Sequence, residues 1–539
     1  MTRIVCAVLM AAAAASAAAQ PHDARPPGRI GAVHFATSCR AEAQPEFDRA
    51  VALLHSFWFS AAIEAFDAVL ARDPACAMAD WGIAMSWWGN PFGGFRTPQA
   101  LQAGQAAVSA GRARGAATDR EQAYLAAVAT LFADAAVRDQ RSRTLAYEQA
   151  MAALSARFAD DSEARIFYAL ALGQTAPLTD KTYANQLKAA AILEAEFARQ
   201  PEHPGLAHYI IHSFDVPPLA PRGLAAARRY AAIAPDAPHA LHMPSHTFTR
   251  LGLWQDSIDT NLASAAAART DPGAVSEELH ALDYQVYAYL QTAQDAAASR
   301  TLPLVAPLAA RIPDAGAGNA APPSAGYYAV AAIPARYALE RAVWTEAAAL
   351  TPPGTPFAWA DAVTHFARAL GAARSGQVAA ARRDVARLVD LREIVAATKD
   401  AYWTEQVEIQ RRGAEAWVLL AEGRPSDALA LMQDAVTRED ATEKSAVTPG
   451  PIKPARELLG EMLLQLDRPG EALEAFQATL TREPHRFRAV YGAARAAEAA
   501  GNRALAISHY RALVELAVRA DAERPALAEA RAVLRPSGR

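Results

Sequence analysis

Histidines recur in the middle of this chain at a spacing of 34 residues. That interval separates His208 from His242, His212 from His246, and His246 from His280. A period of 34 residues is typical of a repeat built from two α-helices. Residues one period apart occupy equivalent positions on stacked repeats, so these histidines are expected to line one continuous face.

The same two-helix pattern is clearest near the C-terminus. Ala472, Phe476 and Pro484 follow one another at steps of four and eight residues, and Ala506 and Tyr510 repeat the first two positions 34 residues later. Alanine lets two helices approach closely, the aromatic ring fills the gap to the next repeat, and proline closes the second helix. Because strand-like alternation is scarce, we predict an all-α fold, a right-handed α-solenoid of stacked helix pairs.

Shifts in composition along the chain indicate where its segments begin and end. Two long loops are expected, at 174–193 and 440–454, and long ordered loops on a solenoid often cross its groove and carry function. The predicted segments are a signal peptide at 1–19, an N-terminal segment at 20–45, histidine-containing repeats at 46–310, a flexible loop at 311–328, and further repeats at 329–539.

The first residues predict export. Arg3 precedes an apolar stretch, and three alanines end at Ala19, which together are typical of a secretory signal peptide cut after about that residue. The expected compartment is the bacterial periplasm, and Cys39 and Cys76 then remain. Two cysteines in an oxidising compartment commonly form a disulfide, which here would fasten the N-terminal segment to the first repeats. Two buried free thiols are the alternative.

Charge and hydropathy exclude several classes of partner. The net charge is −4, with 57 acidic and 53 basic residues, and no basic run appears. Nucleic-acid binding is therefore not expected. After the signal peptide no stretch of about 20 apolar residues occurs, so no membrane span is expected either.

The repeats resemble the tetratricopeptide repeat (TPR) superfamily over nearly the whole mature chain. The stretches HPGLAHYIIHSFD and APHALHMPSHTFTRLGLW are similar to those of a bacterial subgroup of exported TPR proteins. The resemblance implies a binding scaffold that holds a protein or peptide in its concave groove, and a small molecule is a further possibility. Fold alone does not fix function.

The histidines point to a metal site. Two histidines four residues apart share one face of a helix and form a common metal-binding pair. Here two such pairs fall on equivalent helices about 8–10 Å apart, so their imidazoles could meet at one ion. Imidazole with one carboxylate suits zinc, copper or iron better than calcium or magnesium. The candidate ligands are His208, His212, His242, His246, His280 and Asp283.

Other side chains are expected around these ligands. His239 and Arg250 should flank the histidine face, and Asp215, Asp259 or Tyr284 could orient a ring nitrogen. Two alternatives stay open: the histidines could bind an anionic or peptide ligand through hydrogen bonds, or they could form a structural stack of hydrogen-bonded rings.

Catalytic residues cannot be assigned from motifs. The sequence has no HExxH, GxSxG, CxxC or glycine-rich phosphate loop. A metal-dependent enzyme of hydrolase or oxidase type, with Asp283 or Glu277 as base, is an alternative to a binding scaffold.

An apolar stripe offers a second candidate binding surface. Trp81, Met85 and Trp88 share one helical face. That face could be the apolar floor of a ligand-binding groove. It could equally be core, which is the more common role of such stripes.

Overall fold

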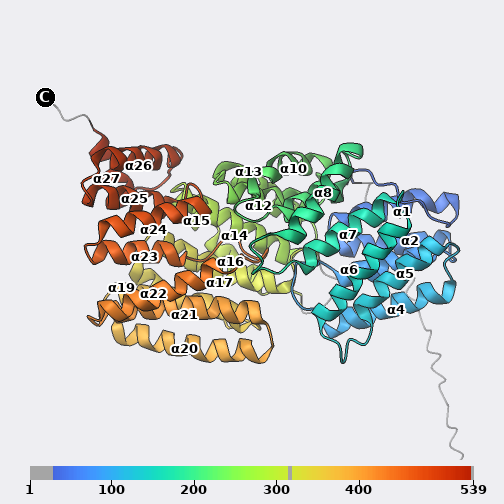
Figure 1. The fold of residues 1–539 in the computed structure, drawn as a ribbon, viewed down its shortest axis with the longest axis horizontal. Helices are drawn as coiled ribbons and strands as arrows, with labels where there is room; N and C mark the ends of the chain where they lie inside the picture. The colour runs from blue at the N-terminus through green and yellow to red at the C-terminus, as the bar shows by residue number, and fades with distance from the viewer. Residues whose placement is uncertain (1–27, 314–318, 536–539) are drawn as a thin grey trace, which may run out of the picture.

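The computed structural model describes residues 28–313 and 319–535. Within these residues the chain forms helices and no strand, which confirms the all-α prediction. The signal peptide predicted at 1–19 lies outside the described residues. Figure 1 shows the helices stacked side by side, from the N-terminal part through the central helices to the C-terminal part.

Three consecutive sections make up the stack. The N-terminal section contains the short 3₁₀ helix η1 (Ala41–Ala43) and helices α1 (Gln44–His55), α2 (Phe59–Arg72), α3 (Ala77–Trp88), α4 (Pro98–Arg114), α5 (Asp119–Phe132), α6 (Gln140–Arg157), α7 (Ser162–Thr175) and α8 (Ala184–Arg199). The central section contains α9 (Pro204–Ser213), α10 (Ala220–Ile233), α11 (Pro238–His242), α12 (Pro244–Arg250), α13 (Trp254–Ala268), α14 (Val275–Gln291), α15 (Asp295–Ser299), α16 (Leu302–Ala309) and α17 (Pro323–Glu340). The C-terminal section contains α18 (Trp344–Ala348), α19 (Ala358–Arg374), α20 (Val378–Ala397), α21 (Ala401–Ala421), α22 (Pro425–Asp440), α23 (Ala455–Gln465), α24 (Pro469–Arg482), α25 (Phe487–Ala499), α26 (Arg503–Leu516) and α27 (Pro525–Leu534).

Most helices pack against their neighbours in sequence, as expected for stacked helix pairs. Long-range contacts bend the stack back on itself. Helix α1 packs against α9, and α14 packs against both α17 and α25. The central helices are therefore covered from both ends of the chain.

The aromatic residues of the repeats fill the gaps between helices, as the sequence predicts. A Cβ atom at Gly82 of α3 would lie 2.1 Å from the ring of Phe66 on α2. In the C-terminal section the ring of Phe476 on α24 presses against Gly460 of α23 and Gly492 of α25 in the same way. These glycines are needed because any side chain would displace the ring.

The predicted loops differ in extent from the observed ones. The connection expected at 440–454 is present, since no helix lies between α22 and α23. The connection expected at 174–193 is shorter, because α8 already begins at Ala184. Helix α17 begins at Pro323, inside the segment expected to be a loop at 311–328, and proline is well suited to the first position of a helix.

The apolar stripe on α3 is buried, and Trp88 at its end also lines a large cavity. Trp81 is 1% exposed and packs edge-on against Tyr124 and Phe167. Met85 and Trp88 are buried as well. Neighbouring helices thus cover Trp81, and the ligand-binding role considered for this stripe stays a prediction.

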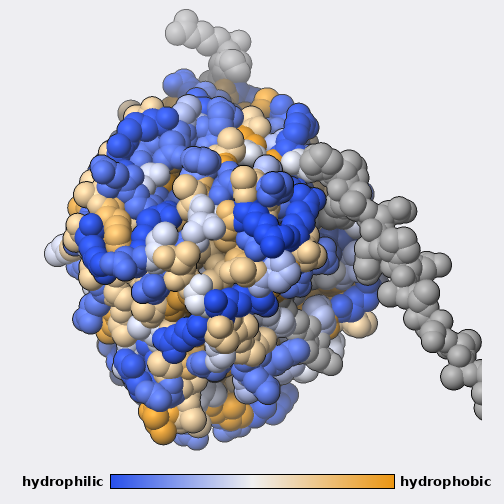
Figure 2. All heavy atoms as spheres, turned by 90° about the vertical axis from the view of Figure 1, so that its right-hand side faces the viewer, coloured by the Kyte–Doolittle hydropathy of each residue, from blue (hydrophilic) through white to orange (hydrophobic). Residues whose placement is uncertain are grey.

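The outer surface is of mixed polarity. Figure 2 shows polar and apolar residues interspersed over the N-terminal end of the molecule. Among the described helices, none has both the length and the apolar composition needed to cross a membrane.

A disulfide joins Cys39 to Cys76, as the sequence predicts. It links the segment before η1 to the start of α3, with Cα atoms 4.9 Å apart across a separation of 37 residues. The crosslink therefore fastens the N-terminal segment to the first helices.

Replacing both Cys39 and Cys76 with alanine is expected to lower the free energy of unfolding by about 2–4 kcal/mol, because the crosslink restricts the unfolded chain. Urea unfolding followed by circular dichroism measures this change. Reduction of the wild-type protein should produce a similar loss. Equal unfolding midpoints for oxidised, reduced and variant protein would contradict the expectation.

Candidate metal centre

The structure gathers the predicted histidines in the central section. It divides them into two groups, each with one ring nitrogen per residue and with those nitrogens within 4.8 Å of one another. His239, expected only to flank the site, is a full member. We call them the first histidine group, which is His208 and His212 of α9 with His239 of α11, and the second histidine group, which is His242 of α11 with His246 of α12 and His280 of α14.

The second histidine group has a defined hydrogen-bond pattern. Asn261 donates through Nδ2 to the carbonyl of Ser257, so its Oδ1 is left to accept from Nδ1 of His242 at 2.7 Å. Nδ1 of His246 donates to the carboxylate of Asp215 at 2.8 Å. Both rings therefore carry their proton on Nδ1, and their Nε2 atoms face each other at 3.2 Å.

The first histidine group is arranged in a similar way. Nδ1 of His208 donates to the carbonyl of His55 at 2.7 Å, and its Nε2 lies 3.1 Å from Nε2 of His239. Nε2 of His212 is buried without a hydrogen-bond partner, as is Nδ1 of His239. The ring of Phe92 stacks on His212, with centroids 4.1 Å apart.

Burial keeps these imidazoles neutral. Loss of solvent is the largest cause that lowers the pKa of His208, His212, His239, His242 and His280 well below the ordinary value, and neighbouring histidines lower it further. Neutral imidazoles have one free lone pair each, which is the form that binds metal ions.

Asp215 is the main anionic partner of the centre. Its carboxylate accepts from His246, from Nε of Arg250 at 2.9 Å and from Nζ of Lys444 at 2.8 Å. Burial alone would raise the pKa of Asp215, but the two cations and His246 lower it well below the ordinary value. Asp215 therefore stays ionised and orients the His246 ring, a role that the sequence suggested for it.

Asp283 does not join either histidine group. It pairs instead with the buried Arg336, whose Nε lies 2.9 Å from its Oδ1. The carboxylate predicted as a ligand is thus paired with a cation through Oδ1, while its Oδ2 is buried without a hydrogen-bond partner. Tyr284 lies nearer, with its hydroxyl 3.3 Å from Nε2 of His246, while Asp259 accepts from Gln255 at the surface.

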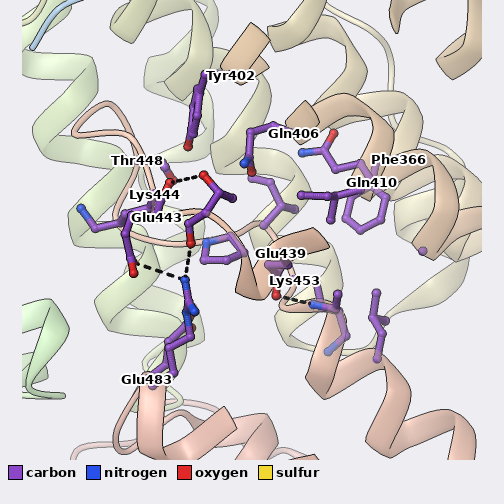
Figure 3. A pocket seen from close by; sticks show the side chains of 18 of the residues that line it. Phe366, Tyr402, Gln406, Gln410, Glu439, Glu443, Lys444, Thr448, Lys453 and Glu483 are labelled. Carbon is purple, nitrogen blue, oxygen red and sulfur yellow. Dashed lines mark hydrogen bonds and ion pairs between the residues drawn. The ribbon is translucent and has the colours of Figure 1, made fainter. Parts of the chain in front are cut away.

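The connection at 441–454, here called the bridging segment, covers the histidines. Lys444 contacts Asp215, and the carbonyl of Thr448 accepts from Tyr284 at 3.1 Å. Arg336 donates to Thr448 and to the carbonyls of Gly450 and Pro451. Figure 3 shows Glu443, Lys444 and Thr448 of this segment around a small pocket. The bridging segment thus packs against residues around the second histidine group.

Glu277 of α14 lies beside the first histidine group. One carboxylate oxygen accepts from the backbone amide of Ala321 at 2.8 Å. The other, Oε2, is buried without a hydrogen-bond partner, 3.8 Å from Nδ1 of His239. Burial is the main cause that raises the pKa of Glu277 to about 7.

A third buried group was not predicted. His55 and His203 each lie 2.9 Å from a different oxygen of Glu163, and the hydroxyl of Tyr209 contacts the other ring nitrogen of His55. Burial opposes ionisation of Glu163, but the two histidines lower its pKa. These contacts join α1, α7 and α9, although Nδ1 of His203 is buried without a hydrogen-bond partner. His203 carried no sequence signal, since it falls outside the 34-residue register.

Known proteins resemble this chain only in the arrangement of helices. No family model matches it, and no curated protein matches it. Among solved structures it is similar to a human IFIT1 dimer with m7Gppp-AAAA, with 10% identity and a TM-score of 0.34 over 78% of this chain and 87% of that chain. Yeast Tom70 has 11% identity and a TM-score of 0.28 over 90% of this chain and 88% of that chain. The TPR domain of P58(IPK) has 15% identity and a TM-score of 0.21 over 68% of this chain and 98% of that chain. At these values the similarity carries nothing about function.

Glu439, which lines the pocket beside the bridging segment, is expected to make the stability of the protein depend on pH. Glu439, at the end of α22, is half-buried and accepts from the backbone amide of Ala455 at 2.9 Å. Burial and the nearby Glu483 and Asp440 raise its pKa to about 8, against the opposing charge of Arg482. The pKa of this carboxyl is higher in the folded than in the unfolded protein, so protonation of Glu439 favours the fold. This contribution to stability is complete at a pH below the unfolded pKa and is lost as the pH rises through about 8.

The free energy of unfolding of the wild type is expected to fall between pH 5 and pH 8 as Glu439 ionises. Glu439→Gln should reduce that fall by about 1–2 kcal/mol, with solvent screening taken into account. Urea unfolding of the variant and the wild type across that range measures the difference. Glu474→Gln, which changes an outward-facing position of α24, is the control. Parallel pH profiles for wild type and Glu439→Gln would contradict the assignment.

Proposed function

We propose that this chain binds transition-metal ions at two adjacent three-histidine sites, the first and second histidine groups. The observation that carries the proposal is the pair of Nε2 atoms, 3.2 Å apart, on His242 and His246. Their Nδ1 atoms are committed as donors to Asn261 and Asp215, so each Nε2 presents a lone pair to the other.

Two lone pairs at this distance repel each other unless a proton or a cation lies between them. A tetrahedral metal ion with nitrogen ligands about 2.0 Å away holds those nitrogens about 3.3 Å apart. The 3.2 Å separation in the second group and the 3.1 Å separation between His208 and His239 agree with that geometry.

The surroundings of the histidines support the same conclusion. Metal-binding histidines usually donate their other ring nitrogen to a carboxylate, amide or carbonyl oxygen, as His242, His246 and His208 do here. His212, His239 and His280 each have a buried ring nitrogen without a hydrogen-bond partner. A bound ion would satisfy ring nitrogens of this kind.

Ligand chemistry limits which ion fits. Neutral imidazoles favour zinc, copper or iron, whereas calcium and magnesium require oxygen ligands. Export would place the centre outside the cytoplasm, where the Cys39–Cys76 disulfide is stable. The helical repeats act as a rigid scaffold, and a protein or peptide partner would use a surface other than the space that the bridging segment fills.

The metal proposal predicts a defined stoichiometry. Mature protein without a histidine tag is expected to bind two equivalents of zinc, copper or iron by elemental analysis after loading and gel filtration. His246→Ala should retain one equivalent, and His208→Ala should retain the other, because each variant removes one ligand set. The double variant should retain none.

His34→Ala is the matched control, because the His34 side chain is 78% exposed and lies outside both groups. It should bind as much metal as the wild type. Circular dichroism should establish that each variant remains helical. If wild-type protein takes up no metal from any of the three ions, or if both single variants keep two equivalents, the proposal fails.

Catalysis at the same centre is the second candidate function, and Glu277 favours it. Each group supplies three imidazoles, the number that catalytic zinc sites combine with one open position. A divalent ion there would polarise a carbonyl or phosphoryl oxygen. The unpartnered Oε2 of Glu277 lies beside His239, where it can accept a proton from a reactant.

Metal-loaded protein is then expected to hydrolyse p-nitrophenyl acetate, and Glu277→Gln should lower the rate about 100-fold while metal content is unchanged. Glu278→Gln is the matched control, since the neighbouring Glu278 is also buried but pairs with Arg269. Absence of metal-dependent hydrolysis in the wild type, or equal rates in Glu277→Gln, would eliminate the catalytic candidate and leave metal binding intact.

A further inference from the structure

A large cavity lies between the N-terminal and C-terminal sections of the stack. Its volume is about 970 Å³, which is ample for a small-molecule ligand. One wall is the connection between α3 and α4, at 89–97, and the opposite wall is formed by α19, α20 and α21. In Figure 1 these walls belong to the blue and the orange parts of the molecule, with α17 between them. No histidine of either group lines this cavity.

The lining of the cavity is rich in aromatic rings. Trp359 and Trp403 stack with centroids 4.0 Å apart and planes at 6°, and Phe357 adjoins Trp359 at 5.5 Å. Phe95 and Ile394 also line the cavity, and they are 61% and 49% exposed. Large apolar side chains left exposed around a concavity mark a site for an apolar ligand.

One cation on the lining has no anionic partner. Arg96 donates to the carbonyl of Asn90, and its Nε is buried without a hydrogen bond. Its guanidinium lies 4.9 Å from the ring centroid of Trp88, and that of Arg143 lies 5.6 Å from the same ring. Within residues 28–313 and 319–535, neither arginine forms an ion pair with a carboxylate. Burial and the nearby Arg143 lower the pKa of Arg96 to about 9.

The other charged side chains on the lining already have hydrogen-bond partners. Asp361 accepts from the backbone amide of Thr355 at 2.9 Å, and Asp400 caps α21 by accepting from Trp403 at 3.1 Å. Arg387 donates to Asp390, outside the cavity, at 3.4 Å. Arg96 is therefore the lining cation best placed to receive an anion.

We infer that this cavity binds a small aromatic molecule with an anionic group, whose rings contact the tryptophans and whose anion pairs with Arg96. An arginine forms charge-assisted hydrogen bonds with a carboxylate, and these are stronger than bonds between neutral groups. Aromatic rings add stacking contacts of defined geometry. The inference does not depend on the metal centre.

Phe92 connects this cavity to the histidines. Its ring lines the cavity and also stacks on His212 of the first histidine group. A ligand in the cavity would therefore lie one aromatic ring away from the proposed metal centre and would not contact its histidines.

The test uses 2-naphthoate as the probe and the neutral 2-naphthylmethanol as its isostere, with isothermal titration calorimetry on the mature protein. The expected result is one site and about tenfold tighter binding of the anion, because one charge-assisted contact distinguishes the two molecules. Arg96→Gln should abolish that preference. Trp403→Leu should weaken both probes at least tenfold by removing a stacking partner.

Arg387→Gln is the matched control, because Arg387 also lines the cavity but is paired with Asp390. It should preserve the preference for the anion. Phe357→Ala provides a second test of the aromatic wall if Trp403→Leu does not fold. His246→Ala, which removes a ligand of the proposed metal centre, should bind 2-naphthoate as the wild type does.

Three outcomes would overturn the inference. Wild-type protein could bind neither probe, it could bind both equally, or it could lose the preference for the anion in Arg387→Gln rather than in Arg96→Gln. Failure of metal binding with retained 2-naphthoate binding would instead count against the proposed function and leave this cavity assignment in place.

Discussion

The carboxylate of Asp215 holds the centre of this molecule together. It follows α9 and receives His246 and Arg250 from α12, while Lys444 reaches it from a segment 229 residues further along the chain. An ionised carboxylate among buried groups is stable only when cations and donors surround it. The contact therefore orients an imidazole and fixes the bridging segment over the histidines at once.

Gathering so many imidazoles in one interior is costly, since each ring loses solvent and each has a nitrogen that needs a partner. In the third buried group Glu163 contacts one ring nitrogen of His55 and one of His203, while Nδ1 of His203 stays without a partner. The first and second histidine groups lack such a carboxylate between their rings. In the proposed function a metal ion would take the place that Glu163 has in the third group, because it would accept the ring lone pairs where the carboxylate accepts ring protons.

The 34-residue period was sufficient to predict the stacked helices and the histidine face, because equivalent positions of a repeat lie side by side. It could not predict the division into two groups. His239 and His242 both lie in α11, less than one helical turn apart, yet His239 joins the histidines of α9 and His242 joins those of α12 and α14. Nor could it place Lys444 or Arg336, because their partners come from distant segments whose packing no local pattern encodes.

The aromatic cavity and the histidines lie on opposite sides of Phe92, and this arrangement follows from how the stack bends. Contacts of α14 with α17 and α25 bring the C-terminal section back over the central helices. The bridging segment then closes the histidine side, while Ser445 and Val447 of the same segment line the cavity. One connection thus contacts residues around the second histidine group and also lines the cavity.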